Sequence, residues 1–167
     1  MISSMSTKSQ FEVDYTYPYA SHAAQLINEL SQYLEKLTGD NGKGSYDVEL
    51  FNKDTDAFVV LRVAHKPIAC GAIRFVDQDT CEIKRMYSRQ RGTGSEMLYV
   101  LENKARLLGY SKAILSARKI NRAALDFYRK HNYQEIPAFG KYRTSELSIC
   151  LGKQLIDVHS ESSTRSW

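Results

Sequence analysis

The chain has 167 residues, of which 43% are apolar and 25% charged, and its formal net charge is +4. This length suits one domain with a sizeable hydrophobic core. No apolar run approaches the length of a membrane span, and residues 1–7 lack the apolar core of a signal peptide. The three cysteines form no Cys-x-x-Cys pair and the four histidines are scattered, so we expect a reduced, cytoplasmic protein without a zinc site or another metal.

In the first quarter of the chain, the pattern predicts a loose start, one strand and one helix. Residues 1–10 are polar and expected to be loose, whereas residues 11–17 alternate as a strand should. A helix is predicted from Ser21, because apolar residues recur at helical spacing as far as Leu37. Residues 39–45 contain three glycines and are expected to form a loop.

The middle of the chain is predicted to hold three strands followed by a long helix. Residues 57–64 and 68–76 read as a hairpin, and residues 81–88 read as a third strand. The helix begins near Gly94 and ends at Gly109, with an apolar stripe along one side.

The last third is predicted to continue with strands and one helix. A strand over residues 112–117 and a helix over 120–130 are followed by closing strands at 133–136 and 145–151. Residues 156–167 are rich in serine and are expected to be a disordered tail. This order of elements favours the α/β class, with a mixed sheet and helices on both of its faces.

Residues 89–94 read Arg-Gln-Arg-Gly-Thr-Gly and connect a predicted strand to a predicted helix. A tight turn with two glycines can expose several backbone N–H groups, and a helix N-terminus adds partial positive charge, so the loop suits a diphosphate. It lacks the Gly-Lys-Ser/Thr ending of a P-loop, and Met97 stands where a dinucleotide fingerprint needs a third glycine. On spacing alone, an ordinary turn or helix start is favoured over a phosphate site.

Positive charge is concentrated around this loop. Residues 84–130 hold 12 Lys/Arg and 3 Asp/Glu, a net charge of +9. Residues 1–83 hold 7 Lys/Arg and 12 Asp/Glu, a net charge of −5. A polyanionic ligand should therefore favour the middle segment. Nucleic-acid binding is the rival function, but no helix-turn-helix or RNP pattern is visible and the glycine loop would be left unexplained.

Three motifs, in the right order, resemble the GCN5-related N-acetyltransferases. Arg89, Gly92 and Gly94 are similar to the family's cofactor loop, residues 82–87 to the strand before it, and residues 121–128 to its Asn-x-x-Ala-x-x-Phe-Tyr helix. The resemblance implies a single acetyltransferase domain over residues 11–155. It also implies acetyl-CoA as the co-substrate and a mostly antiparallel sheet of about six to seven strands flanked by helices on both faces.

The resemblance implies that the cofactor is bound by one continuous segment of the chain and by the residue at the start of a later helix. Met86 and Tyr87 would pair with the pantetheine arm, and the loop with Arg89 and Arg91 would hold the diphosphate. Asn121 would hydrogen-bond the arm, although its place before a helix also suits an N-cap. The expected cofactor-binding residues are Met86, Tyr87, Arg89, Arg91, Gly92, Thr93, Gly94, Ser95 and Asn121.

Acetyl transfer requires a neutral amine and a proton for the leaving thiolate. Glu82 is the expected base, acting through water, because many relatives place a glutamate on this strand. Its alternative role is a structural carboxylate paired with Lys84, and Glu49 and Glu146 are the reserves. Tyr128 is the expected acid, by its match to the family's tyrosine.

The resemblance implies that the acceptor is an amine of a small molecule or a peptide. The acidic first half of the chain predicts either a cationic acceptor or only a solvated surface. No membrane partner is expected, a homodimer is allowed, and a non-catalytic acyl-CoA sensor is the alternative to an enzyme. The acidic residues concerned are Asp40, Asp47, Glu49, Asp54 and Asp56.

Overall fold

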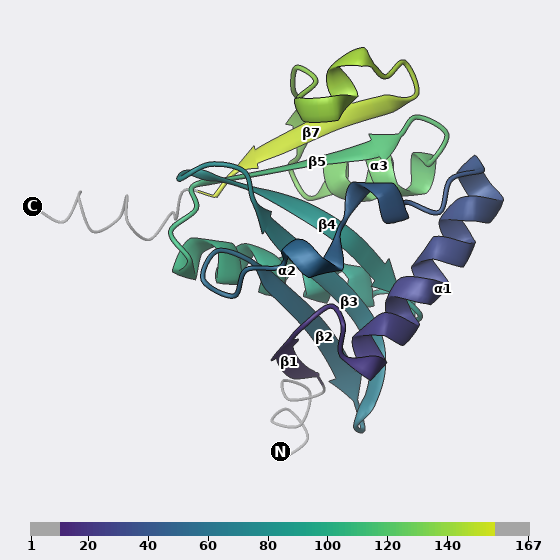
Figure 1. Ribbon diagram of the computed structural model, residues 1–167, viewed down its shortest axis with the longest axis vertical. Helices are drawn as coiled ribbons and strands as arrows, with labels where there is room; N and C mark the ends of the chain where they lie inside the picture. Colours follow the sequence, from purple (N-terminus) through teal and green to yellow (C-terminus); the bar gives the residue numbers. More distant parts are fainter. Residues whose placement is uncertain (1–10, 156–167) are drawn as a thin grey trace, which may run out of the picture.

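A computed structural model describes residues 11–155 and shows one seven-stranded sheet (Figure 1). The strand order is β1-β2-β3-β4-β5-β7-β6, in which β4 and β5 are parallel and every other neighbouring pair is antiparallel. The expected strand number and direction are therefore confirmed. The strands are β1 (Glu12–Thr16), β2 (Ala57–Val63), β3 (Lys66–Phe75), β4 (Thr80–Ser88), β5 (Lys112–Arg118), β6 (Gln134–Glu135) and β7 (Ser148–Gln154).

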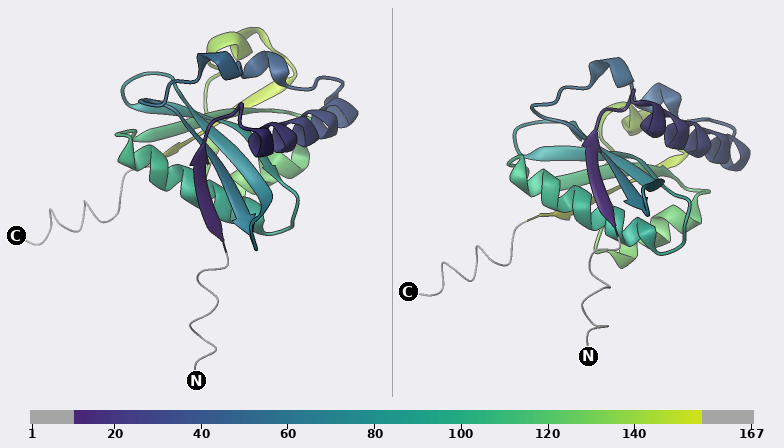
Figure 2. Two further views of the ribbon diagram at one scale, coloured as in Figure 1. Left: turned by 60° about the horizontal axis from the view of Figure 1, so that its bottom comes forward. Right: turned by 90° about the horizontal axis from the view of Figure 1, so that it is seen from below.

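Helices cover both faces of the sheet, as the sequence predicts (Figure 2). Helix α1 (Ser21–Thr38) lies on one face, and α2 (Thr93–Leu107) and α3 (Arg122–Lys130) lie on the other. Three short 3₁₀ helices, η2 (Lys43–Ser45), η3 (Val48–Leu50) and η4 (Gly140–Thr144), lie in the connections. None of the helices in the described range is long and apolar enough to cross a membrane.

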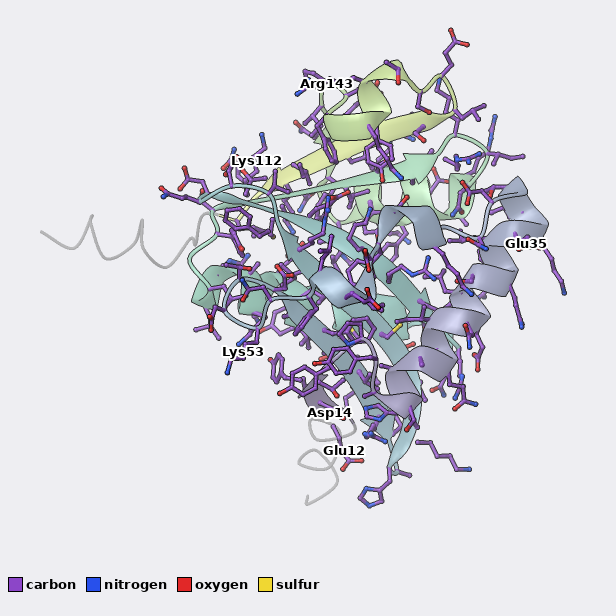
Figure 3. All side chains as sticks on the ribbon, viewed as in Figure 1. Glu12, Asp14, Glu35, Lys53, Lys112 and Arg143 are labelled. Atoms are coloured by element: carbon purple, nitrogen blue, oxygen red, sulfur yellow. The ribbon has the colours of Figure 1, made fainter. Side chains whose placement is uncertain are left out.

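The core has two layers because the side chains of the strands alternate between the faces. In β2, Val59 and Leu61 belong to the cluster beneath α2, whereas Phe58 and Val60 belong to the cluster beneath α1. Side chains crowd between α1 and the sheet, while Lys53 and Arg143 point outward (Figure 3). Both faces are thus buried, which explains the nearly continuous apolar runs in β2 and β3.

The parallel pair β4 and β5 separates soon after it begins. Residues 80–82 pair with residues 112–114, and no pairing between the two strands follows beyond Glu82 and Ile114. Strand β5 stays paired with β7 along its whole length, and β4 stays paired with β3 as far as Ser88, so the two parts of the sheet splay apart between β4 and β5. The register between β3 and β4 also shifts between Cys70 and Ala72, and Arg85 has a φ of 55°. This irregularity bends β4 away from β5 and opens the sheet.

The largest differences from the expected elements lie near the C-terminal end of the described range. The predicted strand 133–136 shrinks to two residues, and the last strand begins at Ser148 and not at residue 145. Pro137 lacks an N–H group and cannot extend β6 as a paired strand. The segment after it contains η4, which places Tyr142 above the gap between β4 and β5. The predictions for residues 1–10 and 156–167 lie outside the described residues.

Candidate active site

A cleft of about 640 Å³ occupies the gap between β4 and β5. Its floor comes from Ile83, Met86 and Tyr87 on β4 and from residues 115–117 on β5. We call its two walls the α3 side and the α1 side. The α3 side consists of Ser88, Gly94, Asn121, Ala123, Ala124, Phe127 and Tyr128. The α1 side consists of Leu30, Tyr33, Leu34 and Thr38 from α1, together with Asp40, Gly42, Ser45, Lys84, Arg85, Arg118 and Tyr142.

The glycine loop forms the N-terminal end of α2, where the α3 side of the cleft begins. Gly92 is the N-cap residue, with a φ of 91°, and no atom of the described residues lies within 4 Å of the position that its Cβ would take. Thr93 is buried, and its hydroxyl donates to the Gln90 carbonyl and contacts the Ser88 hydroxyl. These contacts fix the turn in a conformation that favours glycine.

This turn leaves backbone donors free. Within residues 11–155, no acceptor contacts the backbone N–H groups at positions 91, 92, 94 and 95. Such groups at a helix N-terminus attract an anion, because the helix dipole adds partial positive charge. Ser95 lies in the same turn, with its hydroxyl 3.0 Å from the Nε2 atom of His131.

The two arginines of the loop have different surroundings. Arg89 donates from Nε to the Glu29 carboxylate at 2.8 Å and from Nη1 to the Pro67 carbonyl at 2.8 Å. The hydrogen bond from Arg89 lowers the pKa of Glu29, so this pair ties the end of β4 to α1. Arg91 is exposed and makes no ion pair with any described residue. Of the two, Arg91 is the one available to a ligand at the loop.

Met86 and Tyr87 are on the stretch of β4 that has lost its β5 neighbour. One edge of this stretch pairs with β3, where Cys70 faces Tyr87, and the other edge faces the cleft. The Tyr87 hydroxyl donates to Glu29 at 3.2 Å. Backbone groups on the cleft-facing edge are therefore open to pairing with an extended ligand.

Helix α3 contributes Asn121 and Tyr128. The Asn121 side chain accepts from the Ala124 N–H at 3.3 Å, so it is an N-cap and also lines the cleft. The Tyr128 ring packs edge-on against Phe127 and Tyr133, at centroid distances of 5.1 and 5.5 Å. Its hydroxyl makes no hydrogen bond with any described residue, and burial raises its pKa. Tyr128 thus keeps its proton and can donate it.

Glu82 lies behind the cleft wall, not on it. Its carboxylate is 1% exposed and accepts from Arg74 at 2.6 Å and from Lys84 at 3.2 Å. The Lys84 ammonium also donates to the Tyr142 hydroxyl at 3.2 Å. Lys84 therefore stands between Glu82 and the cleft, and Glu82 has no direct contact with the space where a ligand fits. The reserve residues Glu49 and Glu146 are exposed and do not line the cleft.

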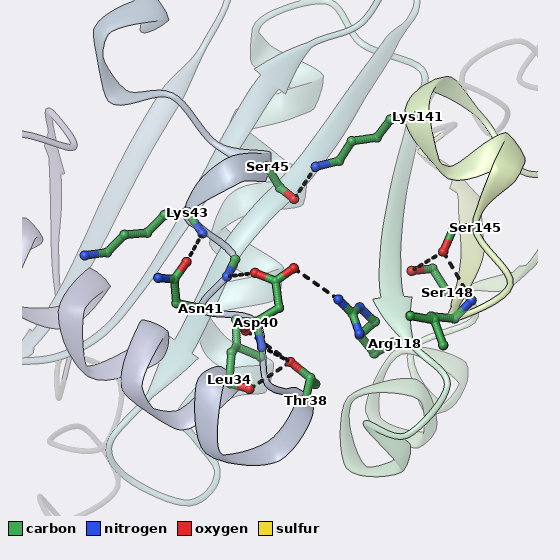
Figure 4. A network of polar contacts seen from close by, with 12 residues as sticks. Leu34, Thr38, Asp40, Asn41, Lys43, Ser45, Arg118, Lys141, Ser145 and Ser148 are labelled. Atoms are coloured by element: carbon green, nitrogen blue, oxygen red, sulfur yellow. Dashed lines mark hydrogen bonds and ion pairs between the residues drawn. The ribbon is translucent and has the colours of Figure 1, made fainter.

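Polar contacts connect segments that are distant in sequence along the α1 side (Figure 4). Arg118 at the end of β5 donates to Asp40 at 3.0 Å, and Lys141 donates to the Ser45 hydroxyl at 2.7 Å. Asp40 also accepts from the Gly42 N–H, which is the main cause of its lowered pKa. Sequence reasoning missed Arg85 and Arg118 as site residues, because no local pattern links them to this wall.

The acidic residues behind the expectation of a cationic acceptor are largely occupied. Asp40 is paired with Arg118, and Asp47 caps η3 by accepting from the Glu49 N–H at 2.9 Å. Asp56 is buried and accepts from the Phe75 N–H at 2.9 Å. These carboxylates hold loops in place, so they give the expectation of a cationic acceptor no support.

Comparisons with known proteins agree with this geometry. A model of the acetyltransferase (GNAT) family matches residues 22–133. An IAA acetyltransferase from Azospirillum brasilense is 28% identical over 143 residues, which cover 83% of this chain and 94% of that protein. A candidate acyl-CoA N-acyltransferase from Klebsiella pneumoniae is 26% identical, with a TM-score of 0.76 over 87% of this chain and 98% of that one.

A more distant structure shares the fold. The PaiA N-acetyltransferase from Thermoplasma acidophilum, solved in complex with coenzyme A, has a TM-score of 0.66 at 13% identity, over 86% of this chain and 98% of that one. The family model covers more than half of the chain, and it spans α1, the open β4–β5 pair, the glycine loop and α3. The resemblance seen in the sequence is confirmed, and the chain belongs to the GNAT family of acetyltransferases.

Proposed function

We propose that the protein transfers an acetyl group from acetyl-CoA to a primary amine while both are bound. The observation that carries the proposal is the opening between β4 and β5, which has free backbone donors at one end and the Tyr128 hydroxyl on its wall. Acetyl-CoA has a diphosphate for the donors and an extended arm for the free edge of β4. Two structural neighbours carry coenzyme A or acetyl-CoA, which supports the same ligand here.

The donor would lie on the α3 side and the acceptor on the α1 side. In this arrangement, the backbone N–H groups at positions 91, 92, 94 and 95 and the Arg91 side chain hold the diphosphate, and the thioester lies near the bend of β4. Asn121 borders the path of the arm. The two substrates then meet through the gap in the sheet, and holding them in position supplies much of the rate.

The chemistry requires two proton movements. The amine nitrogen attacks the thioester carbonyl carbon, the C–S bond breaks, and the leaving sulfur takes a proton. We assign this donation to Tyr128, because its hydroxyl keeps its proton and has no competing partner among the described residues. The amine loses a proton, and Glu82 is our proposed acceptor of it, acting through water because its carboxylate lies behind Lys84.

Acetyl-CoA-dependent thermal stabilisation, followed by thiol release against a panel of amines, tests the proposal. A ligand at 100 times its Kd should stabilise the fold by about 2.7 kcal/mol. Stabilisation together with amine-dependent thiol release supports the enzyme, whereas stabilisation without turnover indicates an acyl-CoA sensor. Absence of stabilisation at high acetyl-CoA concentration contradicts both.

A further inference from the structure

The α1 side of the cleft carries more positive than negative charge. Four cations line this wall or are hydrogen-bonded to its residues, against two carboxylates, a surplus of two positive charges. The cations are Lys84, Arg85, Arg118 and Lys141, and the carboxylates are Asp40 and Glu82. A surplus of this kind in a partly enclosed cleft attracts a ligand with a negative group.

Arg85 is the most informative member of this set. Its side chain is 8% exposed and donates to the carbonyls of Ile27 and Asn41, at 3.2 and 3.3 Å, and to the Ser31 hydroxyl. All three acceptors are neutral, and no carboxylate within residues 11–155 pairs with Arg85. Buried charges are normally paired, because an unpaired one loses its hydration without compensation. Burial accordingly lowers the pKa of Arg85.

The neighbouring cations are also incompletely neutralised. Glu82 is shared between Arg74 and Lys84, so one carboxylate serves two positive charges. Among residues 11–155, Lys141 contacts only hydroxyl and aromatic groups, namely the Ser45 hydroxyl and the Tyr142 ring. Only Arg118 has a carboxylate of its own, Asp40. Asp56, the next buried carboxylate, is held by backbone N–H groups.

The same wall has an apolar part. Leu30, Tyr33 and Leu34 line the cleft from α1, and Tyr142 lines it from η4. These side chains can bury a hydrocarbon or aromatic group of an acceptor. The volume of about 640 Å³ must hold the end of the donor as well, so the acceptor group that enters is small.

Resting on the function proposed above, we propose that the acceptor is an amino acid or a close analogue, with a free carboxylate and an apolar side chain. The carboxylate lies toward Lys84 and Arg85 and offsets the surplus charge of the wall. The side chain packs against the apolar residues of α1. The α-amine is then directed at the gap between β4 and β5, where the thioester is expected.

Matched acceptors test the proposal directly. Leucine, leucinamide and 3-methylbutylamine share a side chain but differ in the group beside the amine, and phenylalanine, phenylalaninamide and phenethylamine form a second series. We expect kcat/KM for each amino acid to exceed that for its amide at least tenfold. The comparison is stringent, because the carboxylate raises the pKa of the amine and leaves less of it neutral than in the amide.

Substitution of Arg85 tests whether the α1 side determines the preference for an acceptor with a carboxylate. Arg85→Met and Arg85→Lys both remove the guanidinium fork, but only the second keeps the charge. Arg85→Met should lower the ratio of kcat/KM for leucine over 3-methylbutylamine at least tenfold, whereas Arg85→Lys should keep most of it. Because Arg85 also anchors α1, substitution of the exposed Lys141 by methionine (Lys141→Met) provides a second test. It should lower kcat/KM for leucine about threefold at low salt, with the exposed Lys66→Met, outside the cleft, as its control.

The outcomes separate this inference from the proposed function. If amides and decarboxylated amines are acetylated as well as the amino acids, the carboxylate proposal is overturned while the enzyme stands. An amino-acid preference that survives both Arg85→Met and Lys141→Met contradicts the assignment to this wall. If acetyl-CoA stabilises the protein but no amine of either series releases thiol, and no other primary amine does so, then the proposed function itself fails.

Discussion

The two sides of the cleft are built in different ways. The α3 side relies on backbone groups of one continuous stretch, from the open part of β4 through the first turn of α2, and on the start of α3. The α1 side relies on side chains from segments far apart in sequence. Its contacts Arg85–Asn41, Arg118–Asp40 and Lys141–Ser45 join residues separated by 44, 78 and 96 positions. The difference suggests that the first side serves a ligand common to the family, and the second a ligand particular to this protein.

The substitution expected to impair the α3 side most is one that places a negatively charged side chain at Gly92. Gly92→Asp should weaken acetyl-CoA binding at least about 100-fold, because a carboxylate would replace open space beside the proposed diphosphate. The αL backbone conformation adds strain of about 1–3 kcal/mol for a residue other than glycine. Calorimetric titration with acetyl-CoA measures the effect.

Gly109 offers a matched control for this substitution. It has a φ of 99° and lies just beyond the other end of α2, and no atom in the described part of the chain is within 4 Å of its Cβ position. Gly109→Asp should cost similar stability and leave acetyl-CoA affinity unchanged. Equal losses of affinity in the two variants would mean that strain in α2, and not the loop, controls binding.

Tyr128→Phe tests the chemistry on the α3 side. We expect kcat to fall about 100-fold with little change in acetyl-CoA affinity, since the hydroxyl is proposed to act only on the leaving sulfur. Burial raises the pKa of Tyr128, so the protonated form persists to higher pH than in an exposed tyrosine. The wild-type rate should therefore show no loss of the acid as the pH approaches 10, the ordinary tyrosine value. An equal loss of affinity and kcat would assign Tyr128 to binding.

Much of the α3 side could be predicted from the sequence because its signals are local. The glycine loop, the strand before it and the helix beginning at Arg122 were predicted from neighbouring residues, and the expected family and fold are confirmed. The position of Arg89 could not be predicted, because its partner Glu29 is 60 residues away on α1. Arg85 and Arg118 escaped notice for the same reason, since only the folded sheet places them beside α1 and Asp40.

Glu82 lies behind the cleft wall and is paired with Lys84 and Arg74, and Glu82→Gln tests whether the carboxylate acts as a base or only positions these cations. If Glu82 removes the amine proton, turnover should fall about tenfold to 100-fold at neutral pH and recover at high pH, where more of the amine is neutral. If the carboxylate only positions Lys84 and Arg74, turnover should fall by the same factor at every pH. The pH profile of kcat/KM distinguishes the two, and acetyl-CoA affinity checks that the fold is intact. An unchanged rate would remove Glu82 from the mechanism.

The smallest expected effects come from the two arginines of the loop, and they test where the boundary between the two sides lies. Arg91→Ala should weaken acetyl-CoA binding about three- to tenfold, most strongly at low salt, because an exposed cation acts on the diphosphate through a screened field. Arg89→Ala should leave affinity nearly unchanged and reduce stability by about 0–1 kcal/mol, because its partner is Glu29.

The Glu29 pair also gives the Arg89 substitution a pH signature. The pKa of Glu29 is lowered in the folded protein from its ordinary value of 4.5, chiefly by the hydrogen bond from Arg89. A lowered carboxylate pKa stabilises the fold above that ordinary value, and the contribution is lost as the pH falls through the folded pKa. Arg89→Ala should therefore flatten the decline of stability in this acidic range, whereas Arg91→Ala should not. If Arg89→Ala instead weakens acetyl-CoA binding as much as Arg91→Ala does, then Arg89 leaves Glu29 when the ligand binds, and the two sides share a residue.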